Sequence, residues 1–185
     1  MIYPVTVFGD PVLRKKAEPI TAEFKNLKGF IENMYETMYN SDGVGLAAPQ
    51  VGQSIRLFVL DTTIDEEEEN EPAGIKKVFI NPEIIEIYGE EWSMNEGCLS
   101  VPEIREEILR PESVIIKYQD EKFVVHQESF SGFIARVIQH EYDHLEGILF
   151  VDYLKPLKKR MLKSKLTAIS KGKVIPKYKI KIPGK

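Results

Sequence analysis

The sequence predicts an α+β fold, with mostly antiparallel sheets around a central helix, an N-terminal amphipathic helix and a C-terminal basic helix. Apolar residues recur at helical spacing in three separate stretches. Between the first and the second stretch lie short apolar runs of strand-like composition, divided by proline, glycine and acidic residues. Because these runs follow one another instead of alternating with helices, antiparallel pairing is favoured over a parallel sheet.

The first helical stretch covers residues 22–40, whose apolar residues fall on one face. Thr21 is the expected N-cap, and the polar segment that ends at Gly43 is the expected stop. The helix is therefore expected to pack its apolar face against a sheet.

The middle of the chain predicts an extended loop and then a series of strands. Residues 43–50 are small and uncharged, which suits a backbone that approaches another group closely. Pro82, Gly89 and Pro111 divide the apolar runs that follow and are expected to separate strands. The expected strands are 55–60, 78–80, 83–88, 104–109, 113–118 and 122–127.

Two further helical patterns follow the strands. The first covers residues 133–146 and lies between Ser131-Gly132 and Gly147, which are typical boundary residues. The second covers residues 156–170, with apolar residues on one face and lysines on the other. The residues after 173 are expected to be frayed or strand-like.

Length and composition predict a soluble globular protein. The chain has 185 residues, of which 43% are hydrophobic and 29% charged. We expect residues 1–170 to form a single domain and residues 171–185 a basic C-terminal tail. The longest uncharged stretch, residues 43–55, is broken by glycines and a proline, so no membrane partner is expected. The first twenty residues show no secretory signal pattern, and the expected location is the cytoplasm.

Charge is distributed unevenly along the chain. The net charge is −4, yet the segment from Tyr153 to the end has 12 Lys or Arg and no acidic residue. This segment is either a solvated helix or a surface that attracts a polyanion. Residues 65–71 form an acidic run, which predicts an exposed loop away from any site.

The second helical pattern contains the strongest chemical motif. His140-Glu141-Tyr142-Asp143-His144 has the form H-E-x-x-H, and two of the three histidines of the chain lie in it. A spacing of four residues places both imidazoles on one helix face, where they can bind one metal ion with Glu141 beside them. The helix of residues 133–146 is therefore expected to be a metal-binding helix.

A catalytic site of this type needs a third protein ligand and an open position for water. Cys98 is the strongest candidate, since it is the only thiol and follows a glycine that eases close approach of the backbone. A lone cysteine is more often an inert buried residue. His126 lies in a strand pattern and is interpreted as a sheet or surface residue.

Three motifs, in this order, resemble those of peptide deformylases, enzymes that remove the N-formyl group from newly made proteins of the bacterial type. They are Gly43-Val44-Gly45-Leu46-Ala47-Ala48-Pro49-Gln50, Glu96-Gly97-Cys98-Leu99-Ser100 and Gln139-His140-Glu141-Tyr142-Asp143-His144. The resemblance covers roughly residues 1–165 and weakens in the acidic run and in the tail.

The resemblance implies a role for each matching residue. Cys98, His140 and His144 would be the metal ligands, and Glu141 the general acid and base. Gln50 and the backbone N–H of Leu99 would stabilise the oxyanion that develops when a metal-activated hydroxide attacks the formyl carbon. Backbone groups of three residues would bind an extended peptide; these are Val44, Gly45 and Gly97.

A terminal methionine would require an apolar pocket beside the metal. Phe133 and Val137 lie on the same helix face as the histidines and could line it, with Val44 and Met94 opposite. All four are equally good core residues.

The resemblance also bears on cofactor and partners. It implies one divalent ion, Fe²⁺ in vivo, with Zn²⁺, Ni²⁺ or Co²⁺ as alternatives, whereas a thiolate with two imidazoles would by itself suggest zinc. The expected substrates are N-formylmethionyl peptides of nascent chains. The basic C-terminal segment could contact the ribosome, as the C-terminal helix does in some deformylases.

Two other functions fit parts of the sequence. A metalloendopeptidase would share the H-E-x-x-H helix but take its third ligand farther along the chain, so it would not require Cys98. A non-enzymatic ribosome or RNA-binding module would rely on the basic segment and need no metal.

Overall fold

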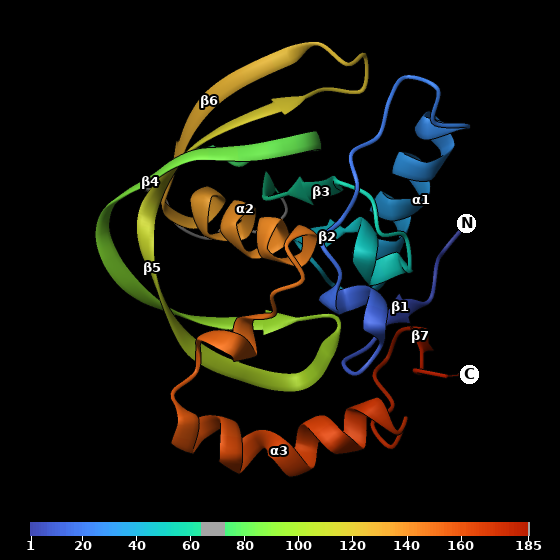
Figure 1. The fold of residues 1–185 in the computed structure, drawn as a ribbon, viewed down its shortest axis with the longest axis vertical. Coiled ribbons are helices and arrows are strands. Elements are labelled where there is room, and N and C mark those ends of the chain that lie inside the picture. The colour runs from blue at the N-terminus through green and yellow to red at the C-terminus, as the bar shows by residue number, and fades with distance from the viewer. Residues whose placement is uncertain (64–72, 185) are drawn as a thin grey trace.

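The structure is a computed structural model that describes residues 1–63 and 73–184 (Figure 1). The acidic run at residues 65–71 lies outside the described residues. Helices are α1 (Leu27–Asn40), α2 (Gly132–Leu145) and α3 (Pro156–Ser170), with short 3-10 turns at Pro11–Arg14, Ala48–Val51 and Phe150–Tyr153. Strands are β1 (Val5–Thr6), β2 (Gly45–Ala47), β3 (Leu57–Asp61), β4 (Lys76–Cys98), β5 (Val101–Gln119), β6 (Val125–Ser131) and β7 (Ile180–Lys181).

The strands form two sheets. The main sheet has the order β2-β3-β4-β5-β6, and every neighbouring pair in it is antiparallel. The second sheet joins only β1 and β7, which run parallel although they lie at opposite ends of the chain. The predicted α+β class with mostly antiparallel strands is therefore confirmed.

The long strands β4 and β5 differ from the short strands expected from the sequence. Pro82 and Gly89 lie at irregularities in the pairing of β4 with β5, not at strand ends. Gly89 has a φ of 86°, which suits glycine at a bulge, and Pro111 pairs with Glu91 inside β5. The expected breaks were wrong because bulges bend these strands instead of ending them, and Figure 1 shows both strands curving around α2.

Helix α1 begins later than its apolar pattern predicts. The N–H of Phe24 donates to the carbonyl of Thr21 in a turn, and Asn26 has a left-handed φ of 57°. A left-handed residue interrupts a right-handed helix, so the expected start at residue 22 was wrong. From Leu27 on, the apolar face packs against β2 and β3, with Met34 and Met38 fully buried.

Helix α2 is enclosed by the main sheet (Figure 1). Its buried residues include Ala135, Ile138 and Leu145, which share one core with Phe58 and Phe79 of β3 and β4. Burial of large apolar side chains on both partners fixes the helix against the strands. The H-E-x-x-H motif is therefore part of a rigid, buried helix.

β1 and β7, which come from opposite ends of the sequence, lie side by side at one edge of the molecule (Figure 1). After α3, Gly172 has a φ of 67°, which reverses the chain and returns it toward the N-terminus. The N–H of Val5 then donates to the carbonyl of Lys179 at 2.8 Å. Among the helices of residues 1–63 and 73–184, none combines the length and apolarity needed to cross a membrane.

Candidate metal centre

A tight turn and a buried helix bring three candidate metal ligands together. β4 ends at Cys98, which pairs with Val101 across a turn made of two residues. One ligand atom each from Cys98, His140 and His144 lies within 4.8 Å of the other two. Sγ of Cys98 is 3.3 Å from Nε2 of His144. These are the three residues that the resemblance implied.

The donor set fits a divalent transition-metal ion. Bonds of about 2.3 Å to sulfur and about 2.0 Å to imidazole nitrogen, at tetrahedral angles, hold such donors about 3.5 Å apart. The 3.3 Å between Sγ of Cys98 and Nε2 of His144 agrees with this value, and the ligand atoms of all three residues lie within 4.8 Å of one another. One thiolate and two imidazoles suit zinc and ferrous iron better than magnesium or calcium. A third ligand farther along the chain, as in the endopeptidase interpretation, is not needed to complete this group.

A carboxylate behind the first imidazole sets its orientation. Glu96 Oε2 lies 3.0 Å from Nδ1 of His140, which leaves Nε2 of that ring for the ion. Such a contact fixes the ring and its tautomer. For His144, Nδ1 is buried and has no hydrogen-bond partner among the described residues.

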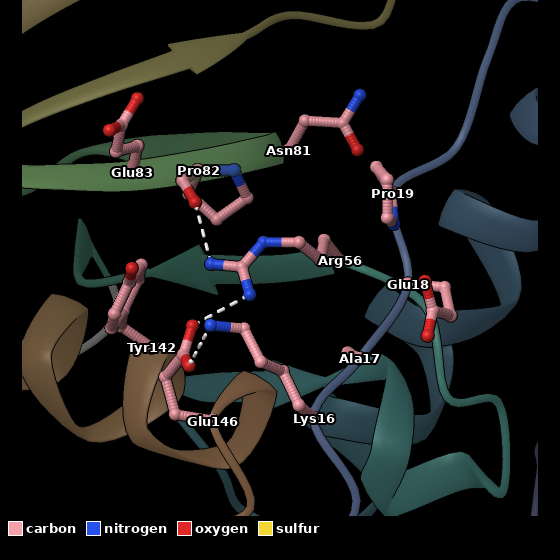
Figure 2. Close-up of a pocket in the computed structure, with 10 residues that line it drawn as sticks. All are labelled: Lys16, Ala17, Glu18, Pro19, Arg56, Asn81, Pro82, Glu83, Tyr142 and Glu146. Carbon is pink, nitrogen blue, oxygen red and sulfur yellow. Dashed lines mark hydrogen bonds and ion pairs between the residues drawn. The ribbon is translucent and has the colours of Figure 1, made fainter.

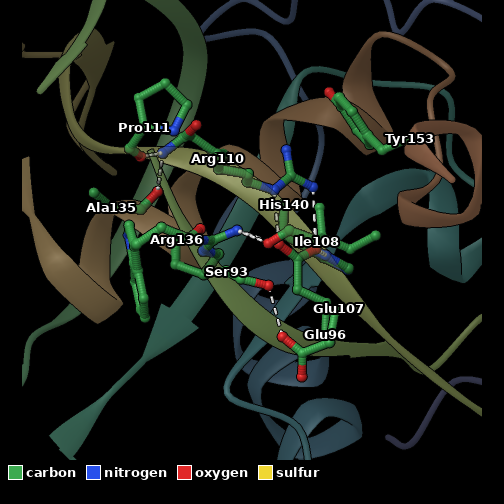
Figure 3. Close-up of polar contacts among 12 residues, drawn as sticks. Ser93, Glu96, Glu107, Ile108, Arg110, Pro111, Ala135, Arg136, His140 and Tyr153 are labelled. Carbon is green, nitrogen blue, oxygen red and sulfur yellow. Dashed lines mark hydrogen bonds and ion pairs between the residues drawn. The ribbon is translucent and has the colours of Figure 1, made fainter. Parts of the chain in front are cut away.

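Two arginines neutralise Glu96 in a buried network (Figure 3). Nε of Arg110 donates to Glu96 at 2.7 Å, and Nη1 of Arg136 donates to it at 3.0 Å. The other arm of Arg110 donates to Asp143 at 2.7 Å, and Asp143 also accepts from the hydroxyl of Tyr153. All four charged side chains are buried, so each charge depends on its partners.

The network shifts the pKa values of Glu96, His140 and His144 in different directions. Burial alone would raise the pKa of Glu96, but hydrogen bonds from His140 and Arg110 hold it well below its usual range. Burial alone would lower the pKa of His140, but hydrogen bonds to Cys98 and Glu96 raise it. Burial and the charge of His140 lower the pKa of His144, which favours the neutral imidazole that can bind a metal.

Glu141 lies beside the ligand group in an enclosed position. Burial raises the pKa of its carboxyl to about 7. Its Oε2 is buried and has no hydrogen-bond partner among the described residues. A Cβ at Gly45 would lie 2.5 Å from Oε1 of Glu141, so only glycine allows β2 this close to the carboxylate.

Gln50 points its amide nitrogen at the centre. Its Oε1 accepts from the N–H of Ala47 at 2.8 Å, which fixes the orientation of the amide. Its Nε2 is then directed toward Cys98 and lies 3.5 Å from Sγ. Leu99 follows directly in the turn, and Gln50 is 1% exposed.

The remaining expected site residues surround this centre less closely. Val44 and Phe133 are partly buried and pack against the core that contains Val137. Gly97 pairs with an arginine of β5, and Met94 is half-buried in β4. His126 is 3.0 Å from Asp120 at the start of β6 and does not belong to the ligand group.

Sequence reasoning missed the buried charges behind the ligands. Glu96 and Asp143 stand inside the motifs that were recognised, but no role was assigned to them. Arg136 interrupts an apolar run of a helix, and Arg110 is two residues after Ile108, on the strand face that is otherwise buried. That position is the signal that could have identified them, since a buried charge requires a partner.

A pocket lies away from the ligand group. It has a volume of roughly 520 Å³ and contains the ion pairs of Glu146 with Arg56 and Lys16 (Figure 2). Tyr142 lines it from the face of α2 opposite the two histidines, and Glu146 follows directly after the end of the helix. None of the expected site residues lines it.

The fold and the ligand group define a metal-dependent hydrolase built on an H-E-x-x-H helix. A family model described as polypeptide deformylase matches residues 2–160. The peptide deformylase of Christiangramia forsetii is 53% identical over 99% of this chain and 97% of its own length.

Solved structures agree with this match. The crystal structure of a peptide deformylase from Legionella pneumophila is similar with a TM-score of 0.81 and 39% identity, over 94% of this chain and 98% of that one. The peptide deformylase from Thermotoga maritima gives a TM-score of 0.73 and 50% identity, over 84% and 99%. The chain belongs to the polypeptide deformylase family, enzymes that remove the N-terminal formyl group from newly made polypeptides.

Proposed function

We propose that Cys98, His140 and His144 hold one divalent ion, which makes α2 the central metal-binding helix. The short distances among their ligand atoms support this assignment. We propose Fe²⁺ as the ion in vivo, with Zn²⁺, Ni²⁺ or Co²⁺ as alternatives that the same donors accept. When bound, such an ion lowers the pKa of water and supplies hydroxide at neutral pH.

In this proposal Glu141 moves the proton. Its carboxylate takes a proton from the attacking water and passes it to the amine nitrogen as the bond to the formyl carbon breaks, so that formate and a free N-terminus leave. The unpartnered Oε2, buried beside the ligand group, supports this role.

Two donors stabilise the oxyanion. The Nε2 group of Gln50 and the N–H of Leu99 donate to the formyl oxygen as it gains charge. The bond from Ala47 to Oε1 of Gln50 supports this assignment, because it turns the amide so that nitrogen faces the centre.

Backbone groups of Val44, Gly45 and Gly97 hold the peptide in an extended conformation. Phe133 and Val137 line the pocket for the methionine side chain. Their place on the ligand face of α2 supports this role. The substrate is the formylmethionyl end of a nascent chain, and the location is the cytoplasm. We assign catalysis to a domain of residues 1–170.

Ribosome contact is proposed for the basic C-terminal segment. α3 exposes lysines along its outer face, and Lys163 and Lys165 are exposed. The double variant K163E/K165E should co-sediment less with ribosomes at low salt, because fewer phosphates are neutralised. Equal co-sedimentation of variant and wild type would contradict this contact.

The clustering of Cys98 with the two histidines is the single observation that carries the proposed function. The decisive experiment combines anaerobic metal analysis with formate release from formyl-Met-Ala-Ser. E141A should retain the ion and lose about 100-fold or more in kcat, because the base is removed while the ligands stay. Full metal content and activity in C98A would instead favour the endopeptidase interpretation.

A further inference from the structure

The turn after Cys98 is held by segments from both ends of the chain. The hydroxyl of Tyr178 donates to the carbonyl of Leu99 at 2.8 Å. The N–H of Phe8 donates to the carbonyl of Ser100, also at 2.8 Å. Both carbonyls of this two-residue turn therefore have partners outside the hairpin of β4 and β5.

The segment that contains Tyr178 is well anchored. Val174 and Ile180 pack against the core that includes Val101, and Cys98 packs against the same core. β7 pairs with β1 directly after Tyr178. Burial raises the pKa of the Tyr178 hydroxyl, so it keeps its proton and donates at neutral pH.

Small movements of the turn formed by Leu99 and Ser100 should affect the reaction rate strongly. It carries the sulfur that binds the ion and, one residue on, the N–H assigned to the oxyanion. Misplacement of such groups by about 1 Å can reduce the rate about 100-fold. The carbonyl and the N–H of Leu99 belong to adjacent peptide units that share the Leu99 Cα. A partner that fixes the carbonyl therefore also restrains the Leu99 Cα, and through it the preceding peptide unit that carries the N–H and joins Leu99 to Cys98.

We propose that Tyr178 is a positioning residue for the deformylation reaction, which holds the Leu99 carbonyl and thereby aims the Leu99 N–H and the Cys98 sulfur. This inference rests on the roles proposed above for Leu99 and Cys98. It makes the C-terminal segment part of the working enzyme, separate from any contact of its lysines with a polyanion.

The test compares Y178F with Y88F in the metal-loaded enzyme. Both variants lose only a tyrosine hydroxyl, and the hydroxyl of Tyr88 contacts Ser129 at 2.7 Å on the outer part of the sheet. For Y178F we expect kcat to fall about three- to tenfold with KM unchanged within about twofold, the loss typical of one hydrogen bond felt in the transition state. Y88F should keep both constants.

Hydrogen exchange at residues 98–101 provides a readout that does not need activity. In Y178F the amides of this turn should exchange at least about threefold faster than in wild type, while Y88F leaves them unchanged. The proposal would be overturned if Y178F had a lower melting temperature but the same kcat and the same exchange rates in the turn as wild type. Hydrogen exchange does not depend on formyl removal. If the wild-type enzyme released no formate, the proposed function would fail, and the exchange rates would still test the role of Tyr178.

Discussion

The buried side chain of Glu96 both contacts His140 and pairs with two arginines. It accepts from Nδ1 of His140 and from two arginines, and it is 5% exposed. In the proposed metal site, this negative charge makes the imidazole a better ligand and holds its ring toward the ion. A neutral side chain of the same shape would keep the packing but lose this effect.

E96Q should therefore weaken ion binding by about 10- to 100-fold, the usual effect of removing a partner behind a ligating histidine. Competition with a chelator measures this affinity directly. E128Q is the matched control, because Glu128 forms its ion pair with Lys77 away from the ligand group. Equal affinities for E96Q and E128Q would show that Glu96 does not act on the ion.

Much of the ligand group could be predicted from local spacing, whereas its support could not. His140 and His144 are one helical turn apart, and the motif around Cys98 pointed to the third ligand. Arg110 and Tyr178 reach the site from distant segments, and no short pattern encodes such contacts. Their roles depend on how the strands pair and on where the chain end returns.

At the scale of elements, Arg110 joins three of them. It lies in β5 and bonds Glu96 in β4 and Asp143 in α2. The sulfur and the imidazoles come from the same β4 and α2. The arginine therefore joins the strand and the helix that supply the ligands of the proposed metal site.

R110M should lower the free energy of unfolding by about 3–5 kcal/mol, because two buried carboxylates lose their shared partner. R105M is the control: it makes the same substitution at an exposed position of β5 and should change stability by less than about 0.5 kcal/mol. Chemical denaturation of wild type, R110M and R105M measures both changes. A similar loss in both variants would indicate that the ion pairs are not its cause.

A second cluster links β4, β5 and β6 and predicts a pH effect. Partial burial alone would raise the pKa of Glu128, but hydrogen bonds from Lys77 and Tyr118 lower it below its ordinary 4.5. A carboxyl with a lowered pKa stabilises the fold above its ordinary pKa, and this stabilisation disappears as the pH falls through the folded value.

Wild type should therefore lose more stability than E128Q between about pH 5.5 and about pH 3. The difference should stay below about 1 kcal/mol, since these side chains are about one-third exposed. Denaturation at several pH values tests this, and parallel curves for the two proteins would contradict it.

The elements themselves were only partly predictable. The three helices and the antiparallel sheet follow from apolar periodicity and from the order of the segments along the chain. The bulges at Pro82 and Gly89 did not follow, because the same residues end a strand or bend it depending on the strand beside them. The late start of α1 depends on the left-handed Asn26, which no periodicity reveals.

At the scale of the whole molecule, the ion should act as a cross-link. It would connect the end of β4 with α2, so its binding energy should add to the free energy of unfolding. Removal of the ion with a chelator should lower the melting temperature by about 10 °C, if the ion is present at about 1,000 times its dissociation constant. C98A is the control, and its melting temperature should respond far less to the chelator.

The pairing of β1 with β7 also sets an order of events. β7 is made long after β1, because the main sheet and all three helices lie between them in the sequence. Each new copy must therefore leave β1 without its partner strand until β7 has been made. The enzyme can thus complete its fold only after every element that forms the metal centre has already been synthesised.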